Sequence, residues 1–187
     1  MKRKFLLSMV VLMLLTVYTS TSAYAVICAI KPVKKAMGNW CWAASAEMAG
    51  AWAKYSHDPR RTQWDIVKEI YGDYLNLTAS PGEIKRACNY ACHYRENFRH
   101  KDAPMSFEEI NEKIDDEAKV IVANLHNVLH GGRHAVVING SKMKTKEVYF
   151  TDPDVGEGDW ISYKEFLEGT YDREGKYGWR YDMSFRY

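Results

Sequence analysis

The spacing of the apolar residues changes part-way along the chain, and this change limits the folds that the chain can adopt. From Cys41 to Tyr55 the apolar residues recur with the period of a helix face. Beyond residue 118 the period falls to two, which is typical of strands. The predicted strands are 119–125, 134–139, 147–151 and 179–187. Helices followed by strands in this order indicate an α+β domain with an antiparallel sheet.

Helix-capping patterns predict the starts of four further helices. Each pattern is a Ser or Thr followed three residues later by Asp or Glu, which is the capping-box arrangement. The pairs are Thr62 with Asp65, Ser80 with Glu83, Ser106 with Glu109, and Ser162 with Glu165. For the helix that begins near Cys41, Asn39 is a suitable N-cap residue.

Residues 1–25 have the pattern of a secretory signal peptide. Three basic residues at positions 2–4 precede an apolar stretch from Phe5 to Tyr18, and Ala23-Tyr24-Ala25 resembles a cleavage site. The apolar stretch is shorter than the roughly 20 residues that span a bilayer, which favours a cleaved signal over a membrane anchor. We therefore predict a signal peptide at 1–25, a single domain at 26–187, and a secreted or periplasmic protein without a stable membrane anchor.

The charge of the chain belongs to this first segment. The whole chain of 187 residues has 26 Lys or Arg against 24 Asp or Glu, and three of the basic residues lie within positions 1–25. The remaining 162 residues carry 23 basic and 24 acidic side chains, without a long block of one sign. We therefore expect no nucleic-acid partner, and we expect the protein to be a monomer.

Cys41 is a candidate nucleophile because it lies at the start of a predicted helix, in the segment Asn39-Trp40-Cys41-Trp42. A helix N-terminus carries about half a positive charge, which favours the thiolate form of a cysteine. A buried cysteine that packs between two tryptophans is the alternative interpretation.

His134 and Asp152 are candidate partners of that cysteine. His134 follows Gly131-Gly132-Arg133 and opens an apolar strand, whereas the other five histidines have polar or loop-like contexts. If the chain turns near residue 143, the hairpin places Asp152 opposite His134 to within a residue or two. A carboxylate beside an imidazole orients the ring and stabilises its charged form, which is the third role in a catalytic triad.

These motifs resemble those of papain-like cysteine peptidases, in particular the short bacterial secreted and effector-type forms. The resemblance rests on Asn39 to Ser45, on Gly132-x-His134-Ala135-Val136-Val137, and on Asp152-Pro153. It implies a helical lobe that carries the cysteine, a β-rich lobe that carries the histidine, and a cleft between them. It also implies that Cys41 attacks a carbonyl, that His134 transfers protons, and that Asp152 orients His134, with a protein or peptide as the substrate and no cofactor.

One position departs from the pattern of that family. Papain-like peptidases have a Gln about six residues before the cysteine, whose amide donates to the oxyanion, and this chain has Lys35 there. The only glutamine of the chain is Gln63, on a separate predicted helix. Lys35, Asn39 and the backbone N–H of Cys41 are therefore the candidate oxyanion donors. A catalytically inactive binding domain, and an amidase, deamidase or acyltransferase on the same scaffold, are the alternative interpretations.

The three remaining cysteines are candidates for a disulfide, because an exported protein meets oxidising conditions. Cys28 can pair with Cys88 or Cys92, or the last two can pair with each other. A zinc site at Cys88, Cys92 and His93 is disfavoured, because a second pair of ligands is missing. We predict no metal and no cofactor.

Overall fold

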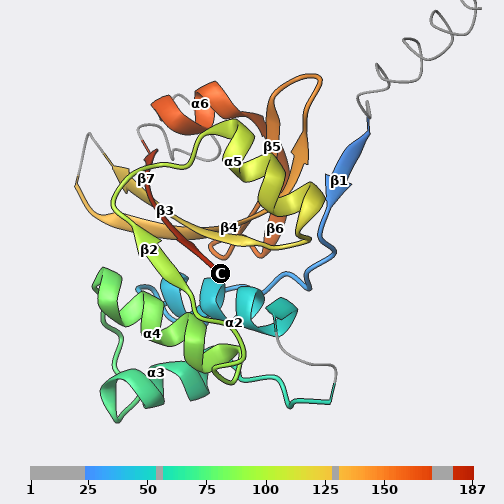
Figure 1. Cartoon of the computed structure of the whole chain (residues 1–187). Helices are drawn as coiled ribbons and strands as arrows, with labels where there is room; N and C mark the ends of the chain where they lie inside the picture. Colours follow the sequence, from blue (N-terminus) through green and yellow to red (C-terminus); the bar gives the residue numbers. More distant parts are fainter. Residues whose placement is uncertain (1–23, 54–56, 128–130, 170–178) are drawn as a thin grey trace, which may run out of the picture.

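The computed structural model describes residues 24–53, 57–127, 131–169 and 179–187. In Figure 1 the helices α2, α3 and α4 form one lobe below an antiparallel sheet, and the helices α5 and α6 cover the opposite face of that sheet. The α+β class is as the sequence predicts, and the helices α2, α3 and α4 precede the central strands of the sheet.

The helical lobe consists of α2 (Cys41–Ala53), α3 (Gln63–Tyr71) and α4 (Pro81–Ala91). Capping boxes at Thr62 and Ser80 start α3 and α4, as predicted. Gly50 lets α2 approach α4 closely, because a Cβ atom at this position would lie 2.3 Å from the Cβ of Ala91. The last two residues of the predicted first helix lie outside the described residues.

The start of α2 differs from the prediction, because Asn39 is not its N-cap. The carbonyl of Trp40 accepts the hydrogen bond from Ala44 N–H, so Trp40 is the capping residue. The amide of Asn39 donates instead to the carbonyl of Asn76, and the backbone N–H of Asn39 donates to Asn76 Oδ1. These two bonds hold the segment before α2 against the chain that leads into α4.

The sheet has the strand order β2-β7-β3-β4-β5-β6, and β1 pairs with the far end of β4. Its predicted central strands are observed, and the hairpin between β4 and β5 turns at residues 143–146. The strands β1, β2 and β6 were not predicted, and the first two have three residues each. The strands are β1 (Ala25–Ile27), β2 (Arg99–Lys101), β3 (Ile121–Asn127), β4 (Arg133–Lys142), β5 (Glu147–Asp152), β6 (Glu157–Ser162) and β7 (Trp179–Arg186).

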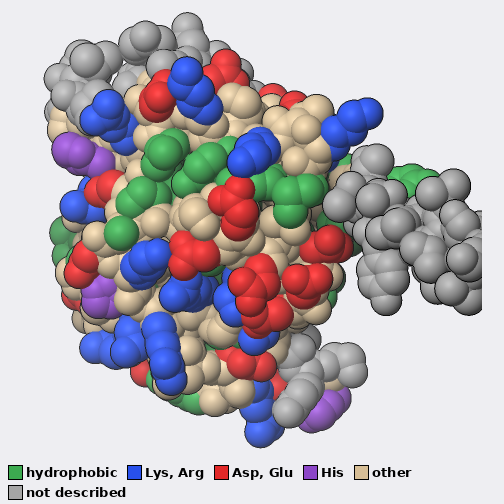
Figure 2. Space-filling model, turned by 45° about the horizontal axis from the view of Figure 1, so that its top comes forward, with side chains coloured by type: hydrophobic (Ala, Val, Ile, Leu, Met, Phe, Trp, Pro, Cys, Tyr) green, Lys and Arg blue, Asp and Glu red, His purple; other side chains and the backbone are tan. Residues whose placement is uncertain are grey.

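The outer face of the sheet is covered by α5 (Phe107–Asn111), a π-helical turn η1 (Glu112–Asp116) and α6 (Tyr163–Glu168). Ser106 and Ser162 cap α5 and α6, as predicted. Figure 2 shows this side of the molecule, where basic and acidic side chains are intermixed. Lys146 and Glu108 form one of the ion pairs there, at 3.0 Å.

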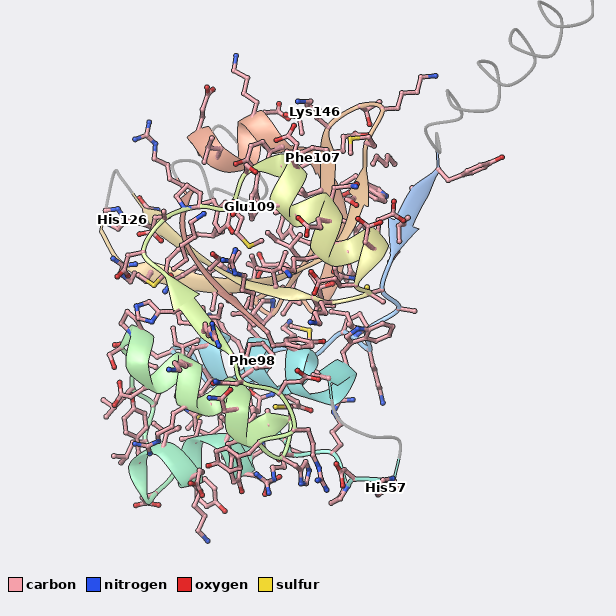
Figure 3. All side chains as sticks on the ribbon, in the orientation of Figure 1. His57, Phe98, Phe107, Glu109, His126 and Lys146 are labelled. Carbon is pink, nitrogen blue, oxygen red and sulfur yellow. The ribbon has the colours of Figure 1, made fainter. Side chains whose placement is uncertain are left out.

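The two lobes are joined through a buried aromatic contact and a hydrogen bond. Phe98, labelled in Figure 3 where the chain crosses between the lobes, is fully buried, and its ring centroid lies 4.6 Å from that of Tyr187. The hydroxyl of Ser45 on α2 donates to the carbonyl of Ala135 on β4 over 3.0 Å. Among the described residues, no helix has the length and apolar character needed to cross a membrane.

Candidate active site

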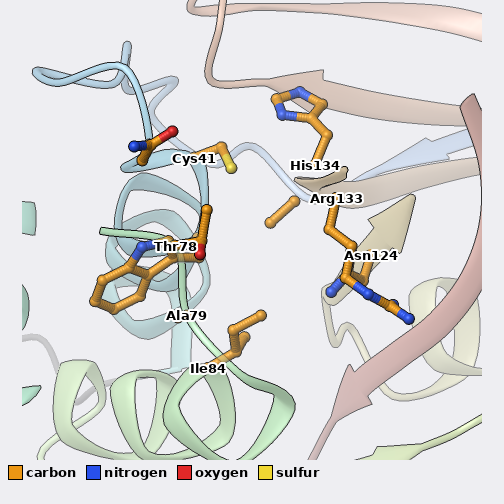
Figure 4. Close-up of a pocket in the computed structure, with 10 residues that line it drawn as sticks. Cys41, Thr78, Ala79, Ile84, Asn124, Arg133 and His134 are labelled. Atoms are coloured by element: carbon orange, nitrogen blue, oxygen red, sulfur yellow. The ribbon is translucent and has the colours of Figure 1, made fainter. Parts of the chain in front are cut away.

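Cys41 is the first residue of α2 and is 9% exposed, at the point where the helix meets β4. Cys41 and Ser45 lie one helical turn apart, and both make hydrogen bonds to the backbone of Ala135. Because Ala135 follows His134 directly, this docking of the helix on the strand brings the thiol to the imidazole. In Figure 4 Cys41 and His134 face each other across a pocket.

His134 and Asp152 are in direct contact, as the sequence predicts. The imidazole Nε2 lies 2.8 Å from Asp152 Oδ1, and both residues are buried. The observed register differs from that of a regular hairpin, because a bulge between Ile138 and Gly140 shifts the pairing of β4 with β5. The side chains still meet across the neighbouring strands, since the imidazole and the carboxylate reach toward each other.

The pKa values of the thiol and the imidazole are displaced in opposite directions. Burial alone raises the pKa of Cys41, but the hydrogen bond and charge of His134, the bond to Ala135 and the charge of Lys35 outweigh it, so the pKa is lowered. Burial lowers the pKa of His134, but the bonds to Asp152 and to Cys41 raise it to about 9. Together these shifts favour a thiolate beside an imidazolium at neutral pH.

A second carboxylate, Asp154, holds Lys35 beside this pair. The Lys35 ammonium lies 2.7 Å from Asp154 Oδ1 and donates to the carbonyl of Gly38 at 2.8 Å. The same Oδ1 lies 3.7 Å from His134 Nδ1. The backbone N–H of Lys35 also donates to the carbonyl of Pro153, so main chain and side chain both join this segment to the β5–β6 turn.

Gln63 supports the segment that carries Lys35, a role that was not predicted from the sequence. Its side chain accepts from the N–H of Ala36 at 2.7 Å and donates to the carbonyl of Lys34 at 3.0 Å. The backbone N–H of Gln63 is itself bound by Glu47 of α2. The glutamine that appeared separate from the site therefore positions Lys35 relative to the helix of Cys41.

The third oxyanion candidate, Asn39, lies exposed on the rim of the pocket. The pocket is bounded by the helical lobe on one side and by β3 and β4 on the other (Figure 4). The residues that line it are Asn39, Cys41, Trp42, Thr78, Ala79, Ile84, Asn124, Arg133, His134 and Ala135. Cys41 and His134 thus line the same pocket, one from each lobe.

Comparison with known proteins identifies the family of the chain. Residues 27–178 match the family model described as Peptidase_C39 like family. The chain belongs to the Peptidase_C39 like family. This membership confirms the resemblance to papain-like cysteine peptidases and makes the chain a member of a peptidase family. A search of curated proteins finds no match.

A solved structure similar to this member of the Peptidase_C39 like family is that of a double glycine motif protease from an AMS/PCAT transporter in complex with the leader peptide. The two chains are 14% identical, and the TM-score is 0.49. The similarity covers 86% of this chain and 93% of that one.

The predicted disulfide is wrong, because Cys28, Cys88 and Cys92 are free thiols, as is Cys41. Cys88 and Cys92 lie one turn apart at the end of α4, and both are fully buried. The Cys92 thiol contacts the carbonyls of Asn89 and Glu96, at 3.3 and 3.6 Å. These sulfurs are therefore accommodated as core side chains.

Three ligand-type side chains of the site, His134, Asp152 and Asp154, lie within 4.8 Å of one another and form the single such group within the described ranges. They contact one another, and Asp154 is paired with Lys35. The absence of a metal stays a prediction. His93, part of the disfavoured zinc site, contacts the carbonyl of Pro59 instead.

Two of the other histidines lie within strands, but neither of them opens its strand. His100 is on β2 and His126 is on β3, and both are exposed. Figure 3 shows His126 and His57 at the periphery of the molecule. Exposure, rather than a loop position, separates them from His134.

Asn124 and Asp154 are site residues that sequence reasoning missed. Asn124 interrupts the apolar run from Val120 to Leu125, and this break in the pattern was the available signal. Asp154 lies two residues after Asp152, and nothing in its sequence context separates it from an ordinary turn residue.

Proposed function

We propose that this chain is an exported thiol peptidase that hydrolyses peptide bonds through Cys41, His134 and Asp152. The observation that carries the proposal is the buried contact of His134 Nε2 with Asp152 Oδ1, at 2.8 Å, on a ring that also bonds to the Cys41 thiol. A nucleophile, a base and a group that orients the base are the parts that acyl transfer through a thioester needs.

The reaction follows from the charges on these groups. The Cys41 thiolate attacks the carbonyl carbon of the scissile bond, and His134 gives its proton to the leaving nitrogen as the C–N bond breaks. Water then attacks the thioester, His134 takes the water proton, and the bond between sulfur and carbon breaks. Asp152 keeps the ring in position and stabilises the imidazolium in both steps.

Two donors are available for the oxyanion of the intermediate. Cys41 begins α2, and the first N–H groups of a helix have no acceptor within the helix. The Lys35 ammonium has three N–H bonds, of which Asp154 and Gly38 engage two, so the third can donate to the oxyanion. We assign Lys35 the part that Gln has in papain-like peptidases; the exposed Asn39 amide is the weaker candidate.

Export and partners belong to the same proposal. Cleavage after Ala25 would leave Val26 and Ile27 in β1, where they pair with Ser141 and Gly140 of β4. We propose a protein or peptide substrate outside the cytoplasm, a monomeric enzyme, and no nucleic-acid partner or membrane anchor.

The test is incubation of the chain, without residues 1–25, with unfolded casein, followed by mass spectrometry of the products. The proposal predicts new peptides with the wild type and none with Cys41→Ala. A mass change of intact casein would instead indicate a deamidase or acyltransferase. An unchanged substrate, together with a Cys41 thiol that iodoacetamide alkylates no faster than free cysteine, would indicate an inactive binding domain.

A further inference from the structure

Asn124 lines the same pocket as the proposed nucleophile and carries an unpaired polar atom. The residue lies on β3, paired with Ala135 of β4, and is 1% exposed. Its Oδ1 has no hydrogen-bond partner among the described residues. Buried polar atoms are satisfied in the great majority of cases, so an unpaired amide oxygen at the wall of an open pocket points to a missing donor.

The surroundings of Asn124 determine which donor fits. Trp42, Ala79 and Ile84 make the facing part of the pocket apolar, so a side chain that enters needs an apolar stem. The Asn124 amide at the opposite wall can offer an acceptor and a donor. A carboxamide can pair with both groups at once through two parallel hydrogen bonds, whereas a thioether or a hydrocarbon side chain leaves the Asn124 oxygen unpaired.

Arg133 disfavours a cationic side chain in the same pocket. Its guanidinium is 2.9 Å from Asp182, and both residues lie next to a bulge between β3 and β7. The bulge leaves Asp182 as the extra residue of β7 opposite Asn124 and Leu125, so the carboxylate can reach Arg133. The ion pair holds the Arg133 guanidinium at the pocket. The Asp182 carboxylate neutralises part of the guanidinium charge, so the attraction of the pocket for an anionic side chain is also weak.

We propose that this pocket, which we call the Asn124 pocket, binds a substrate side chain that ends in a carboxamide, either Asn or Gln, next to the cleaved bond. The inference rests on the proposed function, because it assigns specificity to the same site. Asn124 is then a residue that determines specificity, and its unpaired oxygen is satisfied only when substrate is bound.

The experiment uses short peptides that end in a vinyl sulfone, which alkylates Cys41. Gln, Met, Glu and Lys are placed in turn at each of the two positions before the electrophile. At one of these positions we expect Gln to react about 10-fold faster than Met or more, because Met has a similar shape without hydrogen-bonding groups. A preference for Met, Glu or Lys, or no preference at either position, overturns the proposal.

Two substitutions of Asn124 make the test specific. Asn124→Leu should remove the preference for Gln over Met without lowering the melting temperature, since it removes an unpaired buried oxygen at similar volume. Asn124→Asp should transfer the preference toward Lys. If the preference for Gln survives both substitutions, Asn124 does not determine it and the proposal is overturned. If Asn124→Leu does not fold, the Gln-to-Lys ratio of Asn124→Asp is the deciding measurement.

A matched control separates specificity from stability. Asn139 is a buried asparagine whose amide both donates and accepts a hydrogen bond. Its nitrogen donates to the carbonyl of Cys28, and its oxygen accepts from the hydroxyl of Thr151. Asn139→Leu should lower the melting temperature and leave the ratio of Gln to Met unchanged. Iodoacetamide distinguishes the two failures: rapid alkylation without side-chain preference overturns the Asn124 pocket alone, whereas slow alkylation of Cys41 overturns the proposed function and this inference with it.

Discussion

Cys41 and Cys88 are both buried thiols on helices of the same lobe, yet their surroundings drive their chemistry apart. Cys41 begins α2 and contacts His134, and its pKa is lowered although burial opposes this. Cys88 lies inside α4, where burial raises the pKa and the neighbouring Cys92 raises it further. Burial therefore does not distinguish the reactive cysteine from the structural one. The distinguishing feature is a positively charged partner on the facing strand.

The two cysteines also show what each lobe contributes. The helical lobe supplies both thiols, but only Cys41 lies in the first turn of α2, which contacts Ala135 of β4 through Cys41 and Ser45. The sheet lobe supplies the imidazole and its carboxylates. The site thus exists only where the two lobes meet, and the following experiments test that difference.

The largest expected effect is on alkylation. At pH 7 iodoacetamide should label Cys41 at least ~10³-fold faster than Cys88 in the folded protein, because each unit of pKa changes the thiolate fraction about tenfold. Peptide mapping by mass spectrometry measures both rates in one sample. The rapid phase should vanish in Cys41→Ser, and equal labelling of both residues would contradict the comparison.

The next effect concerns Lys35. Lys35→Ala should lower kcat for peptide hydrolysis by about 10²- to 10³-fold, the loss expected for one oxyanion donor. Lys35→Gln should keep most of the activity, and Asp154→Asn should reduce it less than Lys35→Ala, because the carboxylate positions the ammonium and does not itself donate to the oxyanion. Lys34→Ala is the matched control, since that residue contributes a backbone carbonyl to Gln63; an equal loss in this variant would refute the assignment.

The pH dependence separates the two members of the pair. Hydrolysis should fall about tenfold per pH unit above about 9, where His134 loses the proton that the leaving amine needs, whereas alkylation of Cys41 should not fall. Both rates should fall at acid pH, below the lowered pKa of Cys41. Asp152→Asn should move the alkaline limit to lower pH, because the bond to Asp152 raises the pKa of His134. An alkaline limit that stays in place would show that Asp152 does not act on the ring.

The smallest effect tests the contact between the lobes. Ser45→Ala removes the hydrogen bond to Ala135 and should cost about 1 kcal/mol of unfolding free energy, measured by urea denaturation, with a several-fold loss of kcat. Ser141→Ala removes a comparable bond to Asn111 in the sheet lobe. It should cost similar stability and leave kcat unchanged; a similar loss of kcat in both variants would argue against a positioning role for Ser45.

Much of the fold was predictable because its signals are local. The change from helical to strand spacing and the capping boxes at Thr62, Ser80 and Ser106 depend on residues within a few positions of one another. The strands β1, β2 and β6 were missed, and the first two are too short to show an alternation of their own. The prediction of Asn39 as the N-cap was wrong because the side chain bonds to Asn76, a residue distant in the sequence.

By itself, the sequence determined the α+β class, the Cys41, His134 and Asp152 candidates, and the unusual lysine at position 35. Only the tertiary structure decided that Asp154 and Gln63 hold Lys35 beside the thiol, that Asn124 faces the pocket, and that the other three cysteines are unpaired core residues. The physical reason is the distance along the chain between the groups that interact. Capping and periodicity act along the chain, whereas a pKa, a pocket wall or a disulfide depends on which distant groups the fold brings together.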